Sequence, residues 1–456
     1  MGLKALLMNL PEVKPPEEKK VSFSKRLKWT LLMLVGFFIL SNIPLFGLTV
    51  NALANFEYLS IILGASFGSL MSLGIGPIVT ASIVLQLLVG SKILNIDLQS
   101  TEGKKYFQGL QKLLAIFFVV FEAIIYVSMK GLQAGPGLGW VLIAQLCVGG
   151  LLIILMDEVV SKYGFGNGVG LFIVGGVAWQ LVVKALSFIG PEKILAPIGK
   201  IPVLIVSLIN ADNIGAISAF AAIAATIIIF IVVVYTQSIK VEVPLSFGKL
   251  RGFGMKWPLS FFYTSNIPVI LTAALHANIQ LFATLAERWS GNPTILGGFS
   301  AQGVPISGIV YWISAPPGGI LEHIIKGSFA PTMLLQSLVY IMFMIAGSIL
   351  FAVFWMKTSG MDARSQANQI MGSGLQVPGF RRDPRVIESL LSRYILPLTI
   401  MGGAAVGLLA ASADILGALV RGTGLLLAVM ILYRMYEDIA KQHAMDMNPL
   451  ARKFMT

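Results

Sequence analysis

The chain has 456 residues, a formal net charge of +12, 56% hydrophobic residues and 12% charged residues. Soluble domains carry about 25% charged residues, and a soluble core cannot absorb this much apolar surface. The composition therefore excludes a soluble globular protein and indicates a polytopic membrane protein. The one cysteine, Cys147, excludes a disulfide framework, and the three histidines lack the spacing of metal ligands. We expect neither a metal site nor a cofactor.

Ten apolar segments are long enough to cross a membrane. A helix needs about 20 apolar residues to span about 30 Å of hydrocarbon, and this requirement predicts an all-α bundle of ten transmembrane helices. The ten segments are 29–48, 77–94, 113–130, 138–156, 168–187, 215–236, 264–285, 333–356, 395–412 and 422–439. Segment 1–28 precedes the first span, and the tail 440–456 follows the last.

Positive charges gather on one side of this arrangement. If the loops alternate sides, 26 of the 33 Lys and Arg residues lie on the side that holds both ends of the chain, and six lie on the other side. Cytoplasmic loops are enriched in Lys and Arg, so the sequence predicts that both termini are cytoplasmic. A wrong number of spans would have mixed the two sets, and the split therefore favours ten.

A short apolar segment precedes the second span. Residues 55–63 can form a helix of about 14 Å at 1.5 Å per residue, which is half the thickness of a bilayer. A short apolar helix at membrane depth has to be shielded by protein or line a cavity. We therefore expect 55–66 to dip into the bundle and the chain to return at Pro77, whose missing N–H costs nothing at a helix start. A helix lying on the external surface is the alternative. The glycines that allow the break are Gly64, Gly68, Gly74 and Gly76.

The ten spans divide into two sets of five. In the second span of each set, a proline stands at the start and amide side chains follow about ten residues later, Gln86 after Pro77, and Asn278 and Gln280 after Pro268. Irregular helices at corresponding places in two halves indicate an inverted repeat with the functional site between them. The expected parts are a first half at 29–187, an external hinge loop at 188–214 and a second half at 215–439.

Two cytoplasmic loops, 237–262 and 357–394, are longer than a connection requires. Both carry turn residues around Lys or Arg. Ordinary topogenic charge is one explanation. The other is a docking surface for an anionic partner, such as ribosomal RNA or an acidic protein face.

Five separated motifs together resemble the SecY family, the large (alpha) subunit of the Sec protein-conducting channel. They are GIGPIVTASIVLQLLVGS (74–91), DEVVSKYGFGNGVGLFI (157–173), SNIPVILTAALHANIQ (265–280), VPGFRR (377–382) and GTGLLLAVMILYRMYE (422–437). The resemblance covers essentially the whole chain, and the GLFI and YRMYE segments are similar to the archaeal branch. It implies two inverted five-helix halves around a central pore, with 55–66 as a short re-entrant plug helix.

The resemblance also implies a function and a set of residues. The function is to pass secretory polypeptides across the membrane and to release transmembrane segments laterally into lipid. A ring of aliphatic side chains closes the pore, and a narrow apolar ring resists wetting and so blocks ions. By motif the ring residues are Ile75, Val79, Val169, Ile173, Ile270 and Leu427. For any single one of them, packing against lipid or core is the ordinary alternative.

Further residues follow from the same resemblance. A lateral gate lies between the second and seventh spans, with a polar cluster of Thr80, Glu122 and Asn278 across it. Lys249 and Arg251 in the first long loop, and Arg381 and Arg382 in the second, match residues that dock the ribosome. The implied partners are a SecE-like (gamma) subunit, a small beta subunit, signal peptides, nascent chains and membrane lipid.

Two rival functions and one open question remain at the level of sequence. A secondary transporter would also have inverted repeats and broken helices, but the spans hold few ionisable groups beyond Glu122. An intramembrane enzyme is disfavoured because the chain contains no H-E-x-x-H pair. The chain has no nucleotide-binding loop either. A translating ribosome, or a motor ATPase as in bacteria, would have to supply the energy, and we expect the protein in the cell membrane.

Overall fold

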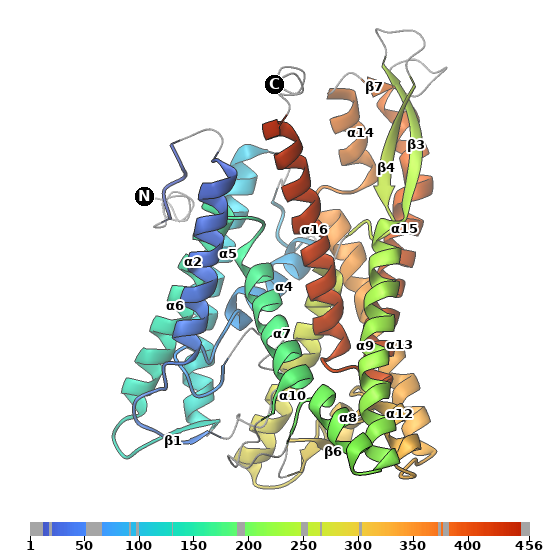
Figure 1. Ribbon diagram of the computed structural model, residues 1–456. Coiled ribbons are helices and arrows are strands. Elements are labelled where there is room, and N and C mark those ends of the chain that lie inside the picture. Colours follow the sequence, from blue (N-terminus) through green and yellow to red (C-terminus); the bar gives the residue numbers. More distant parts are fainter. Residues whose placement is uncertain are drawn as a thin grey trace.

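A computed structural model gives the arrangement of the chain (Figure 1). The structure describes residues 12–17, 21–51, 66–90, 93–96, 100–129, 131–188, 197–247, 254–264, 267–300, 303–372, 375–376 and 383–447.

Ten helices form the body of the part that the structure describes, and each overlaps one predicted span, although the first ends at Ser41 instead of 48 and the third begins at Thr101 instead of 113. They are α2 (Phe23–Ser41), α4 (Gly76–Gly90), α5 (Thr101–Ser128), α6 (Gly139–Tyr163), α7 (Gly168–Leu186), α9 (Asn213–Ser238), α10 (Ile267–Ser290), α13 (Thr332–Thr358), α15 (Pro384–Ile415) and α16 (Gly422–Met447). Seven are long and apolar enough to cross a membrane by length and composition, and these are α5, α6, α7, α9, α10, α13 and α15. The other three are shorter or carry charged residues within the span, as α2 does at Lys25, Arg26 and Lys28.

Local sequence explains where several helices begin. The Ser100 side chain accepts a hydrogen bond from the Gly103 N–H at the start of α5, and Asp212 does the same for Gly215 at the start of α9. Asp383 caps α15, which has Pro384 at its first position. These are preferred N-cap and first-turn residues, because they satisfy or remove N–H groups that have no partner within the helix.

Shorter elements occupy the connections between the long helices. The helices are α8 (Lys200–Ile209), α11 (Gly308–Trp312), α12 (Gly319–Ile325) and α14 (Ala363–Gly372). The strands are β1 (Leu48–Asn51), β2 (Leu132–Ala134), β3 (Lys240–Phe247), β4 (Gly254–Ser260), β5 (Gly298–Phe299), β6 (Pro305–Ser307) and β7 (Leu375–Gln376). They form three small antiparallel sheets, β1–β2, β4–β3–β7 and β5–β6.

Three connections are more ordered than the sequence predicted. The hinge loop 188–214 contains the helix α8. The loop 237–262 is a hairpin of β3 and β4, and the ninth span begins at Pro384 instead of 395. The early part of α15 is amphipathic, with Ile387 and Leu391 buried against α14 and the hairpin, whereas hydropathy detects only continuous apolar sequence.

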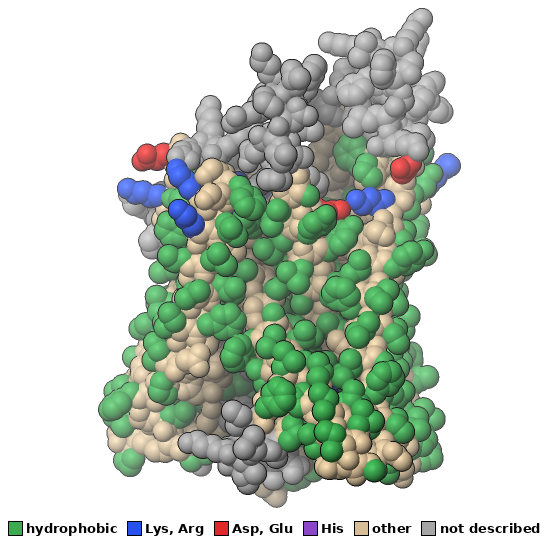
Figure 2. All heavy atoms as spheres, viewed as in Figure 1, with side chains coloured by type: hydrophobic (Ala, Val, Ile, Leu, Met, Phe, Trp, Pro, Cys, Tyr) green, Lys and Arg blue, Asp and Glu red, His purple; other side chains and the backbone are tan. Residues whose placement is uncertain are grey.

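The molecule has one polar end. The sheet β4–β3–β7, the start of α2 and the end of α16 lie together at the top of Figure 1. Figure 2 shows Lys, Arg, Asp and Glu side chains near this end, and below it a surface of many hydrophobic side chains among uncharged ones. An uncharged band of this kind is what the hydrocarbon layer of a bilayer requires.

The two predicted halves meet along two seams. On one side α4 packs against α10 and α13, and on the other side α7 packs against α16. One large apolar cluster joins the halves, with members from α7 such as Phe172 and from α16 such as Leu426. A second cluster lies mainly among α4, α5 and α6 and is closed by α10.

Candidate functional site

The six predicted ring residues come from four helices that meet between the halves. Ile75 lies immediately before α4 and Val79 in its first turn, Val169 and Ile173 lie in the first turns of α7, Ile270 near the start of α10, and Leu427 near the start of α16. Each pair on one helix is four residues apart and so shares a face. The residues therefore all come from helix beginnings, and neighbouring helices bring them to one region.

All six side chains belong to the same apolar cluster. Ile75 and Ile173 are completely buried, Leu427 is 1% exposed and Val79 is 6% exposed, while Val169 and Ile270 are partly buried against the same cluster. Six branched side chains without a polar atom leave no site for a hydrated ion. The region that the sequence assigned to the ring, called the collar below, is thus lined by apolar side chains that are buried or partly buried.

The predicted polar cluster is only partly assembled. The Thr80 hydroxyl on α4 donates to the Glu122 carboxylate on α5 over 3.3 Å, and Glu122 is 8% exposed. Asn278 lies on α10 and is partly buried. Within the described part of the chain it makes no hydrogen bond to either of them. The structure therefore links α4 to α5 at this level and does not link either to α10 through Asn278.

A polar stripe on α10 was missed at the sequence level. Thr272, His276, Gln280 and Thr284 are all buried, and their spacing of four residues places them on one face. The Gln280 amide donates to the Ser314 hydroxyl over 2.7 Å, and His276 Nε2 lies 3.3 Å from the same oxygen. The signal was present in LTAALHANIQLFATL, where a polar residue recurs every fourth position of an apolar span.

The stripe connects α10 to other helices of the second half. The Thr272 hydroxyl lies 3.5 Å from that of Ser348 on α13, and the His276 ring packs near Tyr340 on α13 at 6.0 Å between centroids. Gln336 of α13 donates to the backbone carbonyl of Ser314. Directional contacts thus join α10, the segment after α11, and α13.

The glycine-rich break before α4 is well defined where it is described. Gly68 has φ +95° and Gly74 has φ +52°, values that an L side chain rarely adopts. A Cβ at Gly68 would also lie 2.6 Å from the Asn51 amide nitrogen. Gly76 begins α4. The predicted plug 55–66, apart from its last residue, lies outside the described residues, as does Gly64.

The four predicted docking residues, Lys249, Arg251, Arg381 and Arg382, also lie outside the described residues. The strands that lead to them are described. In the register of β3 with β7, Ser246 pairs with Gln376 and Phe247 pairs with Leu375. The last described residues before the two docking segments, Phe247 and Gln376, therefore lie on adjacent antiparallel strands of one sheet.

An apolar cluster fastens this sheet to the bundle. Val243 and Leu259 pack with buried residues of α14 and α15, and the Tyr263 hydroxyl donates to the backbone carbonyl of Met361 over 2.7 Å. Burial, with the nearby Asp362 carboxylate as a smaller cause, raises the pKa of Tyr263 above its usual range. The tyrosine thus stays protonated and remains a hydrogen-bond donor.

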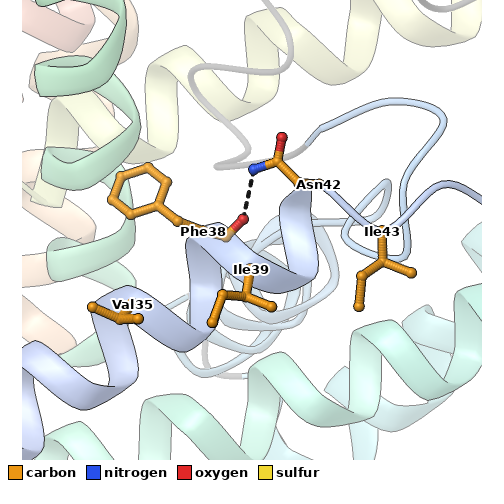
Figure 3. A pocket seen from close by; sticks show the side chains of 5 residues that line it. All are labelled: Val35, Phe38, Ile39, Asn42 and Ile43. Atoms are coloured by element: carbon orange, nitrogen blue, oxygen red, sulfur yellow. Dashed lines mark hydrogen bonds between the residues drawn. The ribbon is translucent and has the colours of Figure 1, made fainter.

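Two further candidates among the described residues give no evidence of a binding site. No group of three His, Cys, Asp or Glu in the described residues could hold a metal ion. Figure 3 shows a pocket of about 500 Å³ on α2, lined by Val35, Phe38, Ile39, Asn42 and Ile43. Its single polar side chain, Asn42, donates to the Phe38 carbonyl over 2.8 Å. The pocket is an apolar depression on a helix surface.

Comparison with known protein families identifies the family to which this chain belongs. The SecY family model matches residues 69–436. The chain belongs to the SecY family. A second model, the plug domain of Sec61p, matches residues 37–68, which include the segment 55–66. The family expected from the five motifs is confirmed.

Relatives and solved structures agree with this membership. The SecY protein translocase subunit of Methanothermobacter thermautotrophicus is 45% identical, over 98% of this chain and 96% of its own length. That of Methanocaldococcus jannaschii is 41% identical over 99% and 98%. A solved protein-conducting channel is 40% identical with a TM-score of 0.83, covering 99% of both chains. Sec61 in a canine ribosome–channel complex from the endoplasmic reticulum is 39% identical with a TM-score of 0.80, again covering 99% of both.

Proposed function

We propose that this chain is the pore-forming subunit of a protein translocation channel in the cell membrane. It passes secretory polypeptides across the membrane and releases transmembrane segments laterally into lipid, and it has no catalytic role. The observation that carries the proposal is the cluster of aliphatic ring side chains contributed by α4, α7, α10 and α16, in a chain whose relatives are protein translocase subunits.

The collar explains how such a channel can stay closed to ions. Water in a narrow apolar constriction loses hydrogen bonds that the wall cannot replace, and an ion cannot pass without water. A polypeptide can still push through, because side-chain contacts with Ile75, Val79, Val169, Ile173, Ile270 and Leu427 are non-directional. A secondary transporter would instead need a polar site at the same depth.

The lateral exit lies where α4 packs against α10 and α13. The contact between Thr80 and Glu122 holds α4 to α5, so we expect these two helices to move together when the gate opens. Asn278, the third gate residue, lies on α10, on the other side of the gate. On the external side, residues 55–66 act as a plug that turns at Gly64, Gly68, Gly74 and Gly76.

The polar end of the bundle is the cytoplasmic end and holds both termini. We propose that Lys249 and Arg251, together with Arg381 and Arg382, form one basic surface that docks a ribosome, because β3 and β7, the strands that precede the two segments, are paired in one sheet. A motor ATPase at the same surface is the alternative source of energy. SecE-like and beta subunits, signal peptides and nascent chains complete the list of partners.

A direct experiment makes the ring polar with only a small loss of volume. Threonine has nearly the shape of valine and one heavy atom fewer than isoleucine, so Val169→Thr combined with Ile270→Thr adds two hydroxyls at the two partly buried ring positions. The control is Val35→Thr on the exposed face of α2, where valine is 56% exposed. We expect the resting ion conductance of the assembled channel in planar bilayers to rise about tenfold for the ring variant only. An assembled ring variant that is as ion-tight as the parent would remove these residues from the pore.

A further inference from the structure

The first turn of α7 is capped by a side chain from another helix. Asp157 lies near the end of α6, and its Oδ1 accepts a hydrogen bond from the Val169 N–H over 2.9 Å. The Gly168 N–H donates to the same carboxylate. The residue at the N-cap position itself, Asn167, makes no capping hydrogen bond with its side chain. Asp157 therefore supplies the oxygen that a local N-cap normally supplies.

The first turn of α16 is held in the same manner. Asp414 lies in the last turn of α15, and its Oδ1 accepts a hydrogen bond from the Gly422 N–H over 2.8 Å. Its other oxygen accepts one from the Tyr340 hydroxyl of α13 over 2.5 Å. Asp414 is 6% exposed, and the Arg421 guanidinium acts on it electrostatically. The start of α16 is thus tied to α15 and α13.

A glycine stands at the first position of both helices and lets the backbones approach. A Cβ at Gly168 would lie 2.5 Å from the Asp157 Cα. A Cβ at Gly422 would lie 2.1 Å from the Ala410 carbonyl oxygen and 2.6 Å from the Ala413 Cβ. Neither position can hold a side chain without moving the preceding helix, so the contact is close as well as hydrogen-bonded.

The two arrangements occupy corresponding places in the two halves. The helices α6 and α7 are the fourth and fifth spans of the first half, and α15 and α16 are those of the second. The connections differ, because Asp157 is twelve residues before the N–H it accepts and Asp414 is eight residues before its own. The same contact is therefore made by two different loops.

We propose that Asp157 and Asp414 are positioning residues that hold the two ring-bearing helices α7 and α16 at the depth and separation that close the collar. This inference rests on the proposed function of the ring. We call each hydrogen bond from the helix start to its aspartate a clamp. In α7 the clamped N–H belongs to Val169, itself a ring residue, and Ile173 follows one turn later. In α16 Leu427 lies five residues after the clamped Gly422, about 7.5 Å along the helix.

The test compares loss of the clamp with loss of an ordinary cap. Asp157→Ala and Asp414→Ala remove the acceptor oxygen, whereas Asp157→Asn and Asp414→Asn keep one. The matched control is Asp212→Ala, which removes the cap of α9 at Gly215, a span that contributes no ring residue. Tyr340→Phe removes only the hydroxyl that donates to Asp414 and keeps the aromatic ring, so it serves if the alanine variant of Asp414 fails to assemble.

Two readouts are taken on purified, assembled channel complex. One is the resting ion conductance in planar bilayers. The other is the transport of a precursor with a defective signal peptide divided by that of the same precursor with an intact one, a ratio that a smaller amount of folded channel does not change. We expect both to rise about fivefold or more in each alanine variant and about twofold in Tyr340→Phe. The asparagine variants and Asp212→Ala should stay near the parent.

The outcomes separate this proposal from the one on which it rests. Suppose that the channel with Val169→Thr and Ile270→Thr conducts ions at rest, but that the alanine variants and Tyr340→Phe conduct no more than the parent. The proposed ring is then retained, and the proposal that Asp157 and Asp414 position it is rejected. Equal leakage from Asp212→Ala would show that any lost cap has this effect, and the positioning role would be rejected. If the ring variant itself is tight, the proposed collar fails and the clamp proposal fails with it.

Discussion

The two faces of α10 differ in the kind of contact they make. One face presents Ala273, Ala277, Leu281 and Leu285, which are buried in a cluster whose other buried members all lie in the first half. The neighbouring face presents the polar stripe, of which Gln280 and His276 lie at Ser314 and Thr272 lies near Ser348, all in the second half. The same helix is therefore joined to its own half by hydrogen bonds and to the other half by apolar contacts.

This difference indicates which contacts can change when the channel opens. Apolar contacts are non-directional, so small side chains can slide or separate without leaving a polar group unpaired. Breaking a buried hydrogen bond leaves a donor or acceptor unsatisfied, at a cost of about 1–3 kcal/mol for each group. We infer that α10 moves with the second half and that the seam with α4 is the place where the bundle parts.

The largest loss of stability is expected when a buried side chain on the apolar face of α10 is truncated. Leu281 is 3% exposed, and Leu281→Ala should destabilise the closed state by about 2–5 kcal/mol, as is usual when a buried leucine is truncated. Because the lost contacts lie in the seam, transport of precursors with a defective signal peptide should increase. The measurement is that transport relative to an intact precursor. A lower melting temperature without any gain in transport would place Leu281 in a seam that does not open.

A smaller effect of a different kind is expected from the polar face. Gln280→Leu leaves Ser314 without the Gln280 donor and should lower the free energy of unfolding by about 1–3 kcal/mol. Since the second half keeps its other contacts in both states, the variant should lose thermal stability without gaining transport of defective precursors. Thermal unfolding of the detergent-solubilised complex checks the first point, and a gain in such transport would contradict the second.

The smallest loss of stability is expected when the hydrogen bond between Thr80 and Glu122, which holds α4 to α5, is removed. Thr80→Val keeps the shape of the side chain and removes one hydrogen bond of 3.3 Å to Glu122. The expected loss in stability is about 0.5–1.5 kcal/mol. If the pair also keeps α4 and α5 together at the gate, the variant should release a transmembrane segment into lipid more slowly. Site-specific photocross-linking of a nascent chain to lipid measures that rate, and an unchanged rate would limit the pair to stability.

Sequence alone predicts those parts of the molecule whose structure is determined by a continuous stretch of neighbouring residues. All ten spans were found because a run of apolar residues is sufficient to specify a membrane helix. The early start of α15 was missed because Arg385, Glu388 and Arg393 interrupt its hydropathy. The hairpin of β3 and β4 was missed because its pairing depends on register between two segments, and each of them contains a proline.

The candidate site shows the same limit. The ring residues could be named only through the family motifs, since a valine at 169 has no property in the sequence that separates it from a lipid-facing valine. Asp157 and Asp414 were not singled out, because the N–H groups they accept from lie beyond a loop. The polar stripe on α10 could have been found from its spacing of four, but the motif drew attention to Asn278, which lies on a different face.

The most direct test of the account joins α10 to each of its neighbours in turn. The native Cys147 is first replaced by serine. One channel carries Ala81→Cys on α4 and Ala277→Cys on α10, two small buried residues of the seam cluster. The matched channel carries Thr272→Cys and Gly347→Cys, whose Cβ atoms would be 3.5 Å apart between α10 and α13, which suits a disulfide. The matched channel is oxidised to its disulfide, the seam channel is linked with a reducible bifunctional thiol reagent, and both are reconstituted into vesicles and assayed for precursor transport before and after reduction. The account predicts that the link across the seam lowers precursor transport to background, and that chemical cleavage of this link restores it. The link within the second half should leave transport unchanged. Full transport with the seam linked, or a block by the α10–α13 link alone, would contradict it.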